Sequence, residues 1–293
     1  MINISLVGCG NWALKIIDEI NDSKNYNLIS IVCRKNKTFK NKYNIFQSIE
    51  KLVESNISDC IYIASLPKIN LEVIKLIKNK NIPLIIEKPV SNSFKNIKEI
   101  KKILEYNKLI IYPNLTNYFS ETFNEYKKLV DDNFKEIKKI IIYEGSFGPF
   151  RKEIHPIWDW GFHSISLLYL LFWEKDFSVI TKKEIKSRDK LQKRIVTKFM
   201  FQIDSKIKVK IVTGNIFKKK LRKMKIILNN NDCITNNMIS HEISYNNKIL
   251  YKNKKTPISS LLEKFENSNF EVSKKLIEVS SKTTEFLEKF YKC

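Results

Sequence analysis

The first third of the chain alternates between short apolar runs and segments with apolar residues at helical spacing. Uninterrupted apolar runs are typical of strands buried on both faces, and a repeat of three to four residues is typical of helices. The predicted strands lie at 2–7, 28–33, 59–64, 84–86 and 109–112, and the predicted helices at about 11–20, 46–54, 71–78 and 95–107. Because strands that alternate with helices form right-handed crossovers, residues 1–115 are expected to build a parallel sheet.

The pattern changes after residue 115. A short helix is predicted at 123–130, a long strand at 137–146, further strands at 195–201, 207–212 and 224–228, and a closing helix at 272–291. The segment 207–212 alternates apolar residues with lysine, which is typical of an antiparallel sheet with one face in water. The closing helix has an apolar stripe and is expected to pack back on the body. Residues 116–293 are therefore expected to form a second domain.

A glycine motif lies between the first predicted strand and the first predicted helix. Gly8, Gly10 and Ala13 form G-x-G-x-x-A, in a chain with only six glycines. In a dinucleotide site the first glycine makes a tight turn, the second lets the pyrophosphate approach the backbone, and the small third residue allows close helix packing. Asn11 and Trp12 begin the helix, whose N-terminus favours anions. An ordinary strand, turn and helix is the alternative interpretation.

The residues after the second strand bear on the choice of cofactor. An NAD site usually carries an acidic residue here for the ribose 2′-hydroxyl, whereas this chain continues with Arg34 and Lys35. Cations suit a 2′-phosphate, so the sequence favours NADP over NAD, although two cations can also arise by chance in a chain so rich in lysine. Ser65 and Leu66, which follow another predicted strand, are also expected to contact the cofactor.

The predicted strand 84–86 ends abruptly in Glu87, Lys88 and Pro89. Proline fixes its own φ, biases the preceding residue away from the helix and can adopt the cis form. Such a kink would direct the Lys88 ammonium to the carboxyl edge of the sheet, where open α/β sheets bind their ligands. The alternative is that two charged residues simply end a strand at the surface.

A second informative stretch precedes a run of leucines. Pro156 suits a helix start, and on that helix Asp159 and His163 are four positions apart and share a face. The imidazole can act as a general base near neutral pH, with the carboxylate as its partner. A polar pair inside a core helix is the alternative. Gly161 weakens that alternative, because glycine within a helix usually marks a close approach by another group.

Aromatic and basic side chains near these motifs are candidate substrate contacts. The aromatic candidates are Tyr118, Trp158, Trp160 and Phe162. They can stack on a sugar face or a flat ring, or fill the core. Arg151 and His155 are candidate contacts for an anionic substituent such as a phosphate or a carboxylate.

Composition excludes several classes of protein. With 293 residues, 43% of them hydrophobic, the chain can fill two cores. No stretch approaches the roughly 18 apolar residues of a membrane span, and the first residues lack the basic region of a signal peptide, so we expect a cytoplasmic protein. The five cysteines are scattered and never spaced C-x-x-C. This argues against a disulfide framework and against a zinc site, and no metal is expected.

The formal net charge of +22 raises the question of a polyanionic partner. The lysines are spread along polar faces and accompany much asparagine and isoleucine, which fits a bias in residue usage better than a binding face. The denser runs, 218–223 and 252–255, are more often solvated loops or strand edges. No aromatic residues cluster among the lysines, so we expect neither nucleic acid nor membrane as a partner.

Together, these motifs resemble those of the glucose-fructose oxidoreductase and inositol dehydrogenase (Gfo/Idh/MocA) family: G-x-G-x-x-A at 8–13, E-K-P at 87–89 and D-x-G-x-H at 159–163. Their order and spacing cover nearly the whole chain. The resemblance implies a Rossmann domain, 1–115, that binds NAD or NADP, followed by a substrate-binding α/β domain, 116–293. The resemblance further implies that this second domain has a large, mostly antiparallel sheet and that the chain forms a homodimer or a homotetramer through it.

The resemblance also implies the chemistry, which is reversible hydride transfer between nicotinamide and a carbinol carbon of a sugar, cyclitol or nucleotide sugar. It implies that Lys88 binds and polarises the reacting oxygen, that His163 exchanges its proton, and that Asp159 holds the substrate or orients the exchange. Glu87 and Pro89 are implied to shape the nicotinamide side of the pocket.

The chain departs from the family pattern in part. Many relatives carry an Asp three residues after the histidine, where this chain has Ser166, and the chain is short for the family. Three alternative functions therefore stay open. They are a cofactor-binding regulatory protein of the same family, a reductase of a non-sugar substrate such as a tetrapyrrole or a dihydrodiol, and a basic nucleic-acid-binding module.

Overall fold

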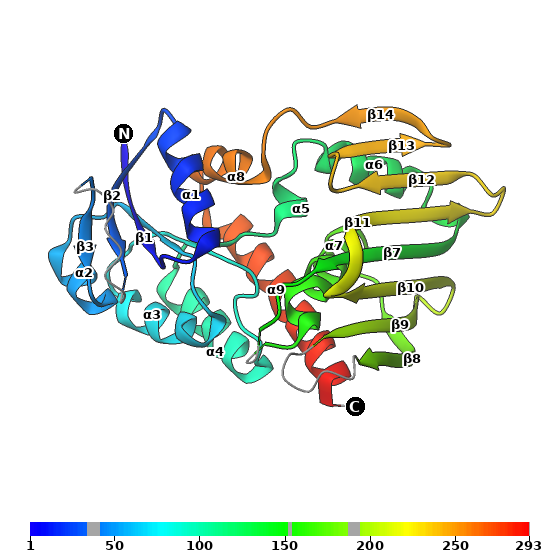
Figure 1. Cartoon of the computed structure of the whole chain (residues 1–293), viewed down its shortest axis with the longest axis horizontal. Helices are drawn as coiled ribbons and strands as arrows, with labels where there is room; N and C mark the ends of the chain where they lie inside the picture. Colours follow the sequence, from blue (N-terminus) through cyan, green and yellow to red (C-terminus); the bar gives the residue numbers. More distant parts are fainter. Residues whose placement is uncertain (34–41, 152–153, 187–193, 293) are drawn as a thin grey trace. The chain divides into compact units, whose positions relative to one another are not determined.

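The computed structural model describes residues 1–33, 42–151, 154–186 and 194–292. They form two compact units (Figure 1). The first consists of Met1–Phe119 and Pro257–Glu288, and the second of Ser120–Thr256 and Lys289–Cys293. The chain thus leaves the first unit close to the predicted division at 115/116 and later returns to it.

A six-stranded parallel sheet, in the order β3-β2-β1-β4-β5-β6, forms the centre of the first unit. Its strands are β1 (Ile2–Val7), β2 (Tyr26–Val32), β3 (Asn44–Phe46), β4 (Cys60–Ile63), β5 (Leu84–Ile86) and β6 (Ile111–Pro113). β4 and β5 are buried at every position, as their apolar runs predict. The strand order reverses between β1 and β4, which is the Rossmann topology and confirms the predicted fold.

Helices surround this sheet in the first unit. They are α1 (Asn11–Asp22), α2 (Ile49–Ser55), α3 (Asn70–Ile77), α4 (Phe94–Asn107), α5 (Thr116–Phe119), α8 (Pro257–Glu266) and most of α9 (Phe270–Lys292), with a 3-10 turn, η1 (Pro67–Ile69). Ser48 and Ser93 accept hydrogen bonds from the first turns of α2 and α4 and cap them. The predicted helix at 46–54 begins later than expected, because Phe46 belongs to β3.

The closing helix α9 covers the edge of the first sheet. The backbone N–H of Ile111, in the edge strand β6, donates to Ser273 Oγ at 2.7 Å, and this hydroxyl donates to the Ile111 carbonyl at 2.9 Å. These bonds replace the ladder partner that an edge strand lacks. Ile277 of the same helix belongs to the core that β4 and β5 help to form. Most of α9 therefore lies with the first unit, whereas the division at 115/116 placed it in the second domain.

An eight-stranded sheet, in the order β14-β13-β12-β11-β7-β10-β9-β8, forms the second unit. Its strands are β7 (Ile137–Phe147), β8 (Phe177–Lys186), β9 (Ile195–Ile203), β10 (Ile207–Gly214), β11 (Ile216–Leu228), β12 (Cys233–Asn237), β13 (Glu242–Tyr245) and β14 (Lys248–Lys252). Neighbouring strands are antiparallel except β7 and β10, which are parallel. This confirms the predicted large, mostly antiparallel sheet.

The lysine run at 218–223, expected in a solvated loop or at a strand edge, lies within the bounds of β11. β11 is an inner strand between β12 and β7. Its pairing with β7 is interrupted between Ile216 and Leu221, and the three lysines of this interval are exposed. An interruption of this kind releases extra residues from the ladder while the strand continues.

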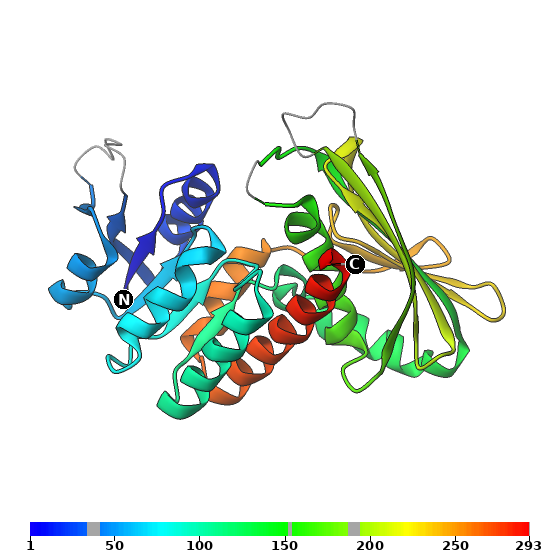
Figure 2. The same ribbon diagram turned by 90° about the horizontal axis from the view of Figure 1, so that it is seen from below.

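The helical segments of the second unit are α6 (Phe123–Asp132), η2 (Phe134–Glu136), η3 (Ile157–Gly161) and α7 (Phe162–Leu171). Figure 2 shows α6 and α7 on one face of the eight-stranded sheet. Along β7, Ile140, Ile142 and Glu144 are buried, whereas Lys139 and Tyr143 alternate with them. We call the face that carries Lys139 and Tyr143 the open face of the sheet.

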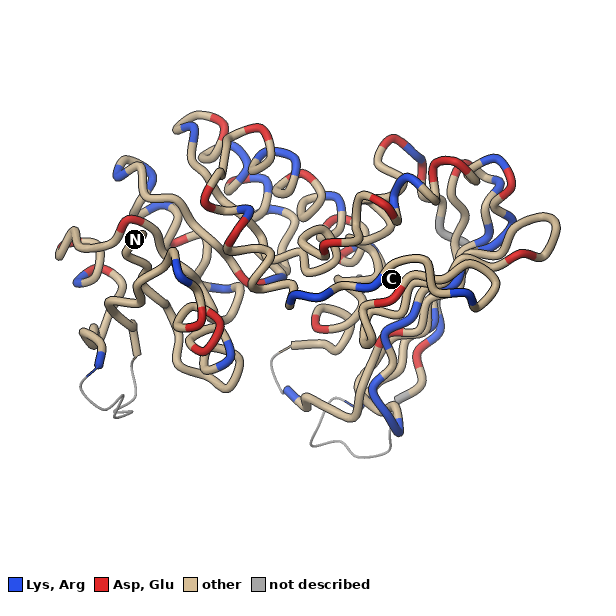
Figure 3. The backbone as a smooth tube through the Cα atoms, turned by 90° about the horizontal axis from the view of Figure 1, so that it is seen from above, with Lys and Arg blue, Asp and Glu red and all other residues tan. Residues whose placement is uncertain are grey.

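Basic residues are distributed over both units, on helices and strands alike (Figure 3). Of the helices in the described part of the chain, none has the length and apolar character that crossing a membrane requires.

Candidate functional site

Gly8 turns the chain at the end of β1 with a φ of +123°, a conformation that side chains other than glycine rarely adopt. A Cβ atom here would lie 2.5 Å from the carbonyl oxygen of Ala64, just after β4. The first motif glycine is therefore required by its own backbone and by the neighbouring strand. Ala13, the third motif position, is fully buried, as close helix packing demands.

The N-terminus of α1 offers backbone donors to a ligand. Gly10 is its N-cap, no side chain of the described residues caps the helix, and the first turn carries no acidic residue. A Cβ atom at Gly10 would meet nothing within 4 Å. Open space before a helix end with free N–H groups and a positive dipole fits a pyrophosphate. Asn11 and Trp12 are exposed beside it, and Lys15 lies over the Trp12 ring.

The turn after β4 reaches the same carboxyl edge of the sheet. The Ser65 hydroxyl oxygen is buried and has no hydrogen-bond partner among the described residues. Leu66, next in the chain, is 37% exposed. Since a buried hydroxyl without a partner is costly, this turn also fits a polar ligand. Arg34 and Lys35, on which the NADP prediction rests, lie outside the described residues.

Two cysteines join the glycine turn to the neighbouring strand. Cys9 and Cys33 form a disulfide with Cα atoms 5.6 Å apart, so the sequence argument against disulfides was wrong for this pair. The physical reason is the parallel register. Val7 lies opposite Val32, which brings together the residues that follow β1 and β2.

The acid of the E-K-P motif is buried in a polar cluster at the ends of β4, β5 and β6. Glu87 Oε1 accepts hydrogen bonds from the Tyr62 hydroxyl at 2.8 Å and from Asn114 Nδ2 at 2.7 Å. Burial raises the pKa of Tyr62 well above 10.0, and the Glu87 carboxylate raises it further, so Tyr62 remains a neutral donor. Lys88 is half-buried next in the chain, and its bond to the buried Pro89 is cis. The cluster therefore fixes the strand end that carries Lys88.

In the second unit, Asp159 and His163 lie in successive helical segments. Asp159 belongs to η3, a π-helical turn, and His163 to α7, so the single regular helix predicted from Pro156 is not observed. A π turn inserted at the start of a helix is frequently found at functional sites. A Cβ atom at Gly161 would lie 3.1 Å from Ile157 in the same turn and 3.5 Å from Thr213 in β10, which is ordinary van der Waals contact, so the close approach by another element is not observed. His163 is 9% exposed.

Both candidate anion contacts have acidic neighbours. Arg151 Nη1 lies 3.5 Å from Asp159 Oδ1. His155 is buried, its Nε2 lies 3.4 Å from Glu184 Oε1, and its Nδ1 accepts from the Ile157 N–H. These carboxylates already partner the two groups.

The remaining candidates differ in exposure. Phe162 and Trp158 are 0% and 4% exposed and pack in the core of the second unit. Trp160 is half-buried, and its Nε1 is buried without a partner among the described residues. Tyr118 is a half-buried residue of the first unit, with Lys264 over its ring. Ser166 is buried, and its hydroxyl donates to the His163 carbonyl at 3.1 Å.

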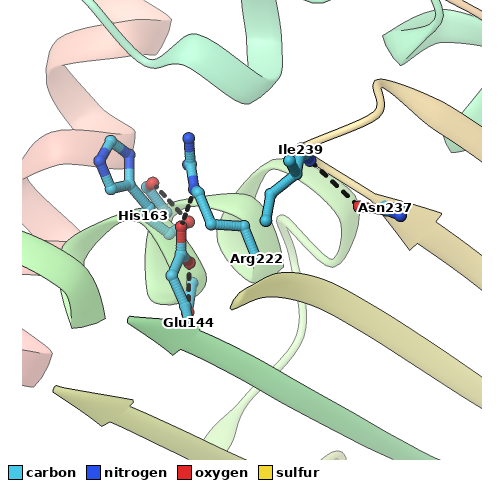
Figure 4. Close-up of polar contacts among 7 residues, drawn as sticks. Glu144, His163, Arg222, Asn237 and Ile239 are labelled. Atoms are coloured by element: carbon cyan, nitrogen blue, oxygen red, sulfur yellow. Dashed lines mark hydrogen bonds and ion pairs between the residues drawn. The ribbon is translucent and has the colours of Figure 1, made fainter. Parts of the chain in front are cut away.

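The sequence reasoning missed a buried ion pair next to His163 (Figure 4). Glu144 of β7 is 0% exposed, and its Oε1 accepts from Arg222 Nε of β11 at 2.7 Å. Its Oε2 accepts from the hydroxyl of Ser164, the residue after His163, at 2.6 Å. One signal was available, because Glu144 continues the buried alternation of Ile140 and Ile142. An acid at such a core position needs a partner.

The sheet order, the glycine turn and the open end of α1 define a Rossmann-fold nucleotide-binding protein. Residues 2–115 match the family model described as the oxidoreductase family with an NAD-binding Rossmann fold. This match covers the first domain of the chain. The comparison with curated protein sequences gives no match.

Solved structures share the fold over nearly the whole chain. A protein described as an oxidoreductase, from Magnetospirillum magnetotacticum, has a TM-score of 0.80 at 14% identity, covering 95% of this chain and 98% of its own. UDP-N-acetylglucosamine 3-dehydrogenase from Acidithiobacillus ferrooxidans has a TM-score of 0.75 at 11% sequence identity, and the match covers 99% of this chain and 98% of that protein. Scyllo-inositol dehydrogenase from Lactobacillus casei was solved with NAD(H) and scyllo-inositol. It has a TM-score of 0.74 at 13% sequence identity, and the match covers 97% of this chain and 94% of that protein. At these identities the likeness establishes the fold.

Proposed function

We propose that this chain is an NAD(P)-dependent oxidoreductase that transfers hydride reversibly between a nicotinamide and a carbinol or carbonyl carbon of a sugar, cyclitol or nucleotide sugar. The observation that carries the proposal is the carboxyl edge of the first sheet. The glycine turn after β1, the uncapped end of α1 and the Glu87-Lys88-Pro89 strand end share this edge. The fold shared with an inositol dehydrogenase and a UDP-sugar dehydrogenase supports the substrate class.

The residues at this edge suit a dinucleotide. Bound NAD or NADP would supply the hydride acceptor or donor. Gly8, Gly10 and the first turn of α1 hold the pyrophosphate, with the exposed Asn11 and Trp12 beside it. The remaining proposed contacts are Arg34, Lys35, Ser65, Leu66, Glu87 and Pro89. In this proposal residues 1–115 bind the cofactor and residues 116–293 bind the substrate.

The proposed chemistry assigns one task to each candidate residue. Oxidation of an alcohol needs its oxygen held in place and its proton removed as the hydride leaves. Lys88 binds and polarises the oxygen through its ammonium group, His163 takes the proton on its imidazole, and Asp159 orients the exchange. Tyr118, Arg151, His155 and Trp158 remain proposed substrate contacts.

The first test is cofactor binding. A thermal-shift screen with NAD, NADP and their reduced forms should raise the melting temperature, because a ligand of the folded state stabilises it by mass action. We expect a larger shift with NADP, and the double variant R34A/K35A should weaken NADP binding while sparing NAD. Tighter NAD binding by the unaltered protein would overturn the NADP preference alone.

The second test is turnover across sugars, cyclitols and nucleotide sugars. We expect Lys88→Ala and His163→Ala each to lose about a hundredfold or more in kcat, the usual size of a general acid–base contribution. Lys80→Ala, at an exposed position shortly before β5, is the matched control and should keep full activity. Full turnover by Lys88→Ala with normal cofactor binding would overturn the assignment. Cofactor binding with no turnover of sugars or of tetrapyrrole and dihydrodiol substrates would favour a regulatory protein.

A further inference from the structure

The ion pair between Glu144 and Arg222 leaves donors of a buried guanidinium unused. The Nε–H of Arg222 donates a hydrogen bond to the fully buried Glu144 carboxylate. Its Nη2 is buried and has no hydrogen-bond partner among the described residues. A guanidinium has five N–H donors in a planar fork, and leaving a buried donor unsatisfied is costly. The Nη2 group of Arg222 can therefore donate to an acceptor that a ligand would provide.

The guanidinium is held by a carboxylate that is itself anchored to a helix. Glu144 is bonded both to Arg222 and to the hydroxyl of Ser164 on α7, so one carboxylate links strand β11 to the helix that carries His163. In the sheet Arg222 and Glu144 are cross-strand partners. Figure 4 shows the side chains of Arg222 and His163 extending on the same side of Glu144, away from the sheet. An acceptor bound by Arg222 would therefore lie beside the candidate proton acceptor.

A second cation lies near the same histidine as Arg222. His241, in the turn after β12, has its pKa lowered by burial and further by the nearby Arg222 and Lys220. This turn is shaped by Asn237, whose side-chain oxygen accepts the N–H of Ile239 at 3.2 Å. A lowered pKa keeps His241 neutral near pH 7, and Glu144 balances the charge of Arg222, so Lys220 is the additional cation of this region. Arginine forks and adjacent cations suit carboxylate and phosphate oxygens.

We propose that Arg222 binds an anionic group, carboxylate or phosphate, on the substrate of His163, so that the protein acts on acidic sugars or polyols rather than on neutral ones. The inference rests on the proposed function and names its substrate class. It also moves the anion contact from the two residues suggested by the sequence to Arg222. Arg151 and His155 already have carboxylate neighbours in Asp159 and Glu184.

The experiment compares a hexuronate, a hexose phosphate and the neutral hexose, with nicotinamide cofactor present. Binding is measured by thermal shift and titration, and KM and kcat by initial rates. The variant Arg222→Lys keeps the charge next to Glu144 but loses the fork. We expect it to raise the KM for the acidic substrate about tenfold or more, the size of a lost charge-assisted hydrogen bond, and to change the neutral hexose less than about twofold.

The matched control is Lys223→Gln. Lys223 is the next residue of β11, and its cross-strand partner is Tyr143 of the open face. The Lys223→Gln variant removes a positive charge one position from Arg222 but leaves the ion pair of Glu144 and Arg222 intact. Binding of every ligand should therefore stay unchanged. A double variant, E144Q/R222Q, removes both charges together and should lose acid binding while keeping its melting temperature closer to that of the unaltered protein than a single Arg222→Gln does.

The outcomes separate this inference from the proposed function. Preference for the uronate identifies a carboxylate as the group, and preference for the hexose phosphate identifies a phosphate. Equal losses on acidic and neutral ligands would reduce Arg222 to a structural role and overturn the inference. Neutral substrates turned over in preference to acidic ones would also overturn it while leaving the oxidoreductase intact. If no substrate is turned over, the binding measurements still test the inference. Equal affinity of the unaltered protein and Arg222→Lys for the acidic ligands would overturn it.

Discussion

The two glycines of the turn after β1 meet different constraints. Gly8 has a positive φ, and a side chain there would collide with the backbone of Ala64. Gly10 faces open space at the N-terminus of α1, and its φ of −77° suits any residue. One glycine therefore serves the fold, and the other leaves room for a ligand.

This difference predicts two distinct phenotypes. Gly8→Ala should destabilise the protein by about 1–3 kcal/mol, the cost of a side chain in a strained backbone conformation. Gly10→Ala should cost about 1 kcal/mol or less, because glycine is preferred to alanine at an N-cap but no side-chain hydrogen bond is lost and the φ of −77° suits alanine. Its methyl group should nevertheless weaken dinucleotide binding about tenfold or more. Chemical denaturation and a cofactor titration measure the two effects, and a Gly10→Ala protein with unchanged affinity would contradict the assigned role.

At the scale of elements, side-chain clusters fix the connections between strands. Asp232, in the turn between β11 and β12, connects this turn to the end of β13, because its carboxylate accepts from Tyr245, Asn246 and Asn230. These bonds favour the ionised carboxylate, and they lower the pKa of Asp232 below its ordinary value of 3.8. A lowered pKa stabilises the fold above the unfolded value and loses that contribution as the pH falls through the folded one.

We therefore expect Asp232→Asn to weaken the dependence of folding stability on pH in the acidic range. Near neutral pH the variant should have a lower denaturation midpoint than the unaltered protein, and the difference should vanish as the pH falls below about 3.8. Midpoints of urea unfolding measured between neutral pH and acid check this. A difference that persists at the acid end would show that the hydrogen bonds act without the charge.

The disulfide between Cys9 and Cys33 connects the ends of β1 and β2 across 24 residues of sequence. Closing a loop of this length stabilises a fold by about 3 kcal/mol in the chain-entropy account. Reduction should therefore lower the denaturation midpoint, and the double variant C9A/C33A should be insensitive to the reductant. Cys60→Ala, which alters a buried free thiol, is the control that keeps the response. A midpoint that does not move on reduction would contradict the prediction.

At the scale of the whole molecule, part of the charge of +22 lies on the open face of the second sheet. On the open face, Lys139 of β7 lies opposite Lys208 of β10, and Lys183 of β8 lies opposite Lys198 of β9. Like charges directly opposite each other repel. Packing this face against a second copy would add further lysine contacts, so charge opposes the homodimer or homotetramer expected through this sheet.

We expect association through this face to strengthen with salt, which screens the repulsion. Sedimentation velocity at about 0.05 M and 0.5 M NaCl should show a larger associated fraction at the higher concentration. The variant Lys208→Ser should associate at lower salt than the unaltered protein. Dissociation on adding salt would point to a different interface, held by ion pairs.

The sequence predicted those elements whose burial produces a recognisable pattern of apolar residues within a single segment. β4 and β5 are continuous apolar runs because both of their faces are covered, and α4 has a regular apolar stripe. β14 is exposed at every position and carries no such pattern, so its pairing with β13 defines it instead. The π turn at Asp159 was equally invisible, because no residue pattern in the segment distinguishes it from a regular helix start.

The sequence by itself determined the glycine turn, the strand ending in Glu87-Lys88-Pro89 and the segment holding Asp159 and His163, because each signal lies within a few adjacent residues. Tertiary structure decided which distant side chains meet. Cys9 and Cys33 depend on the parallel register of β1 and β2, and Glu144 and Arg222 are 78 residues apart until β7 and β11 pair. Strand pairing forms long-range contacts that no local pattern encodes, and here it places a partly unused guanidinium beside the candidate catalytic histidine.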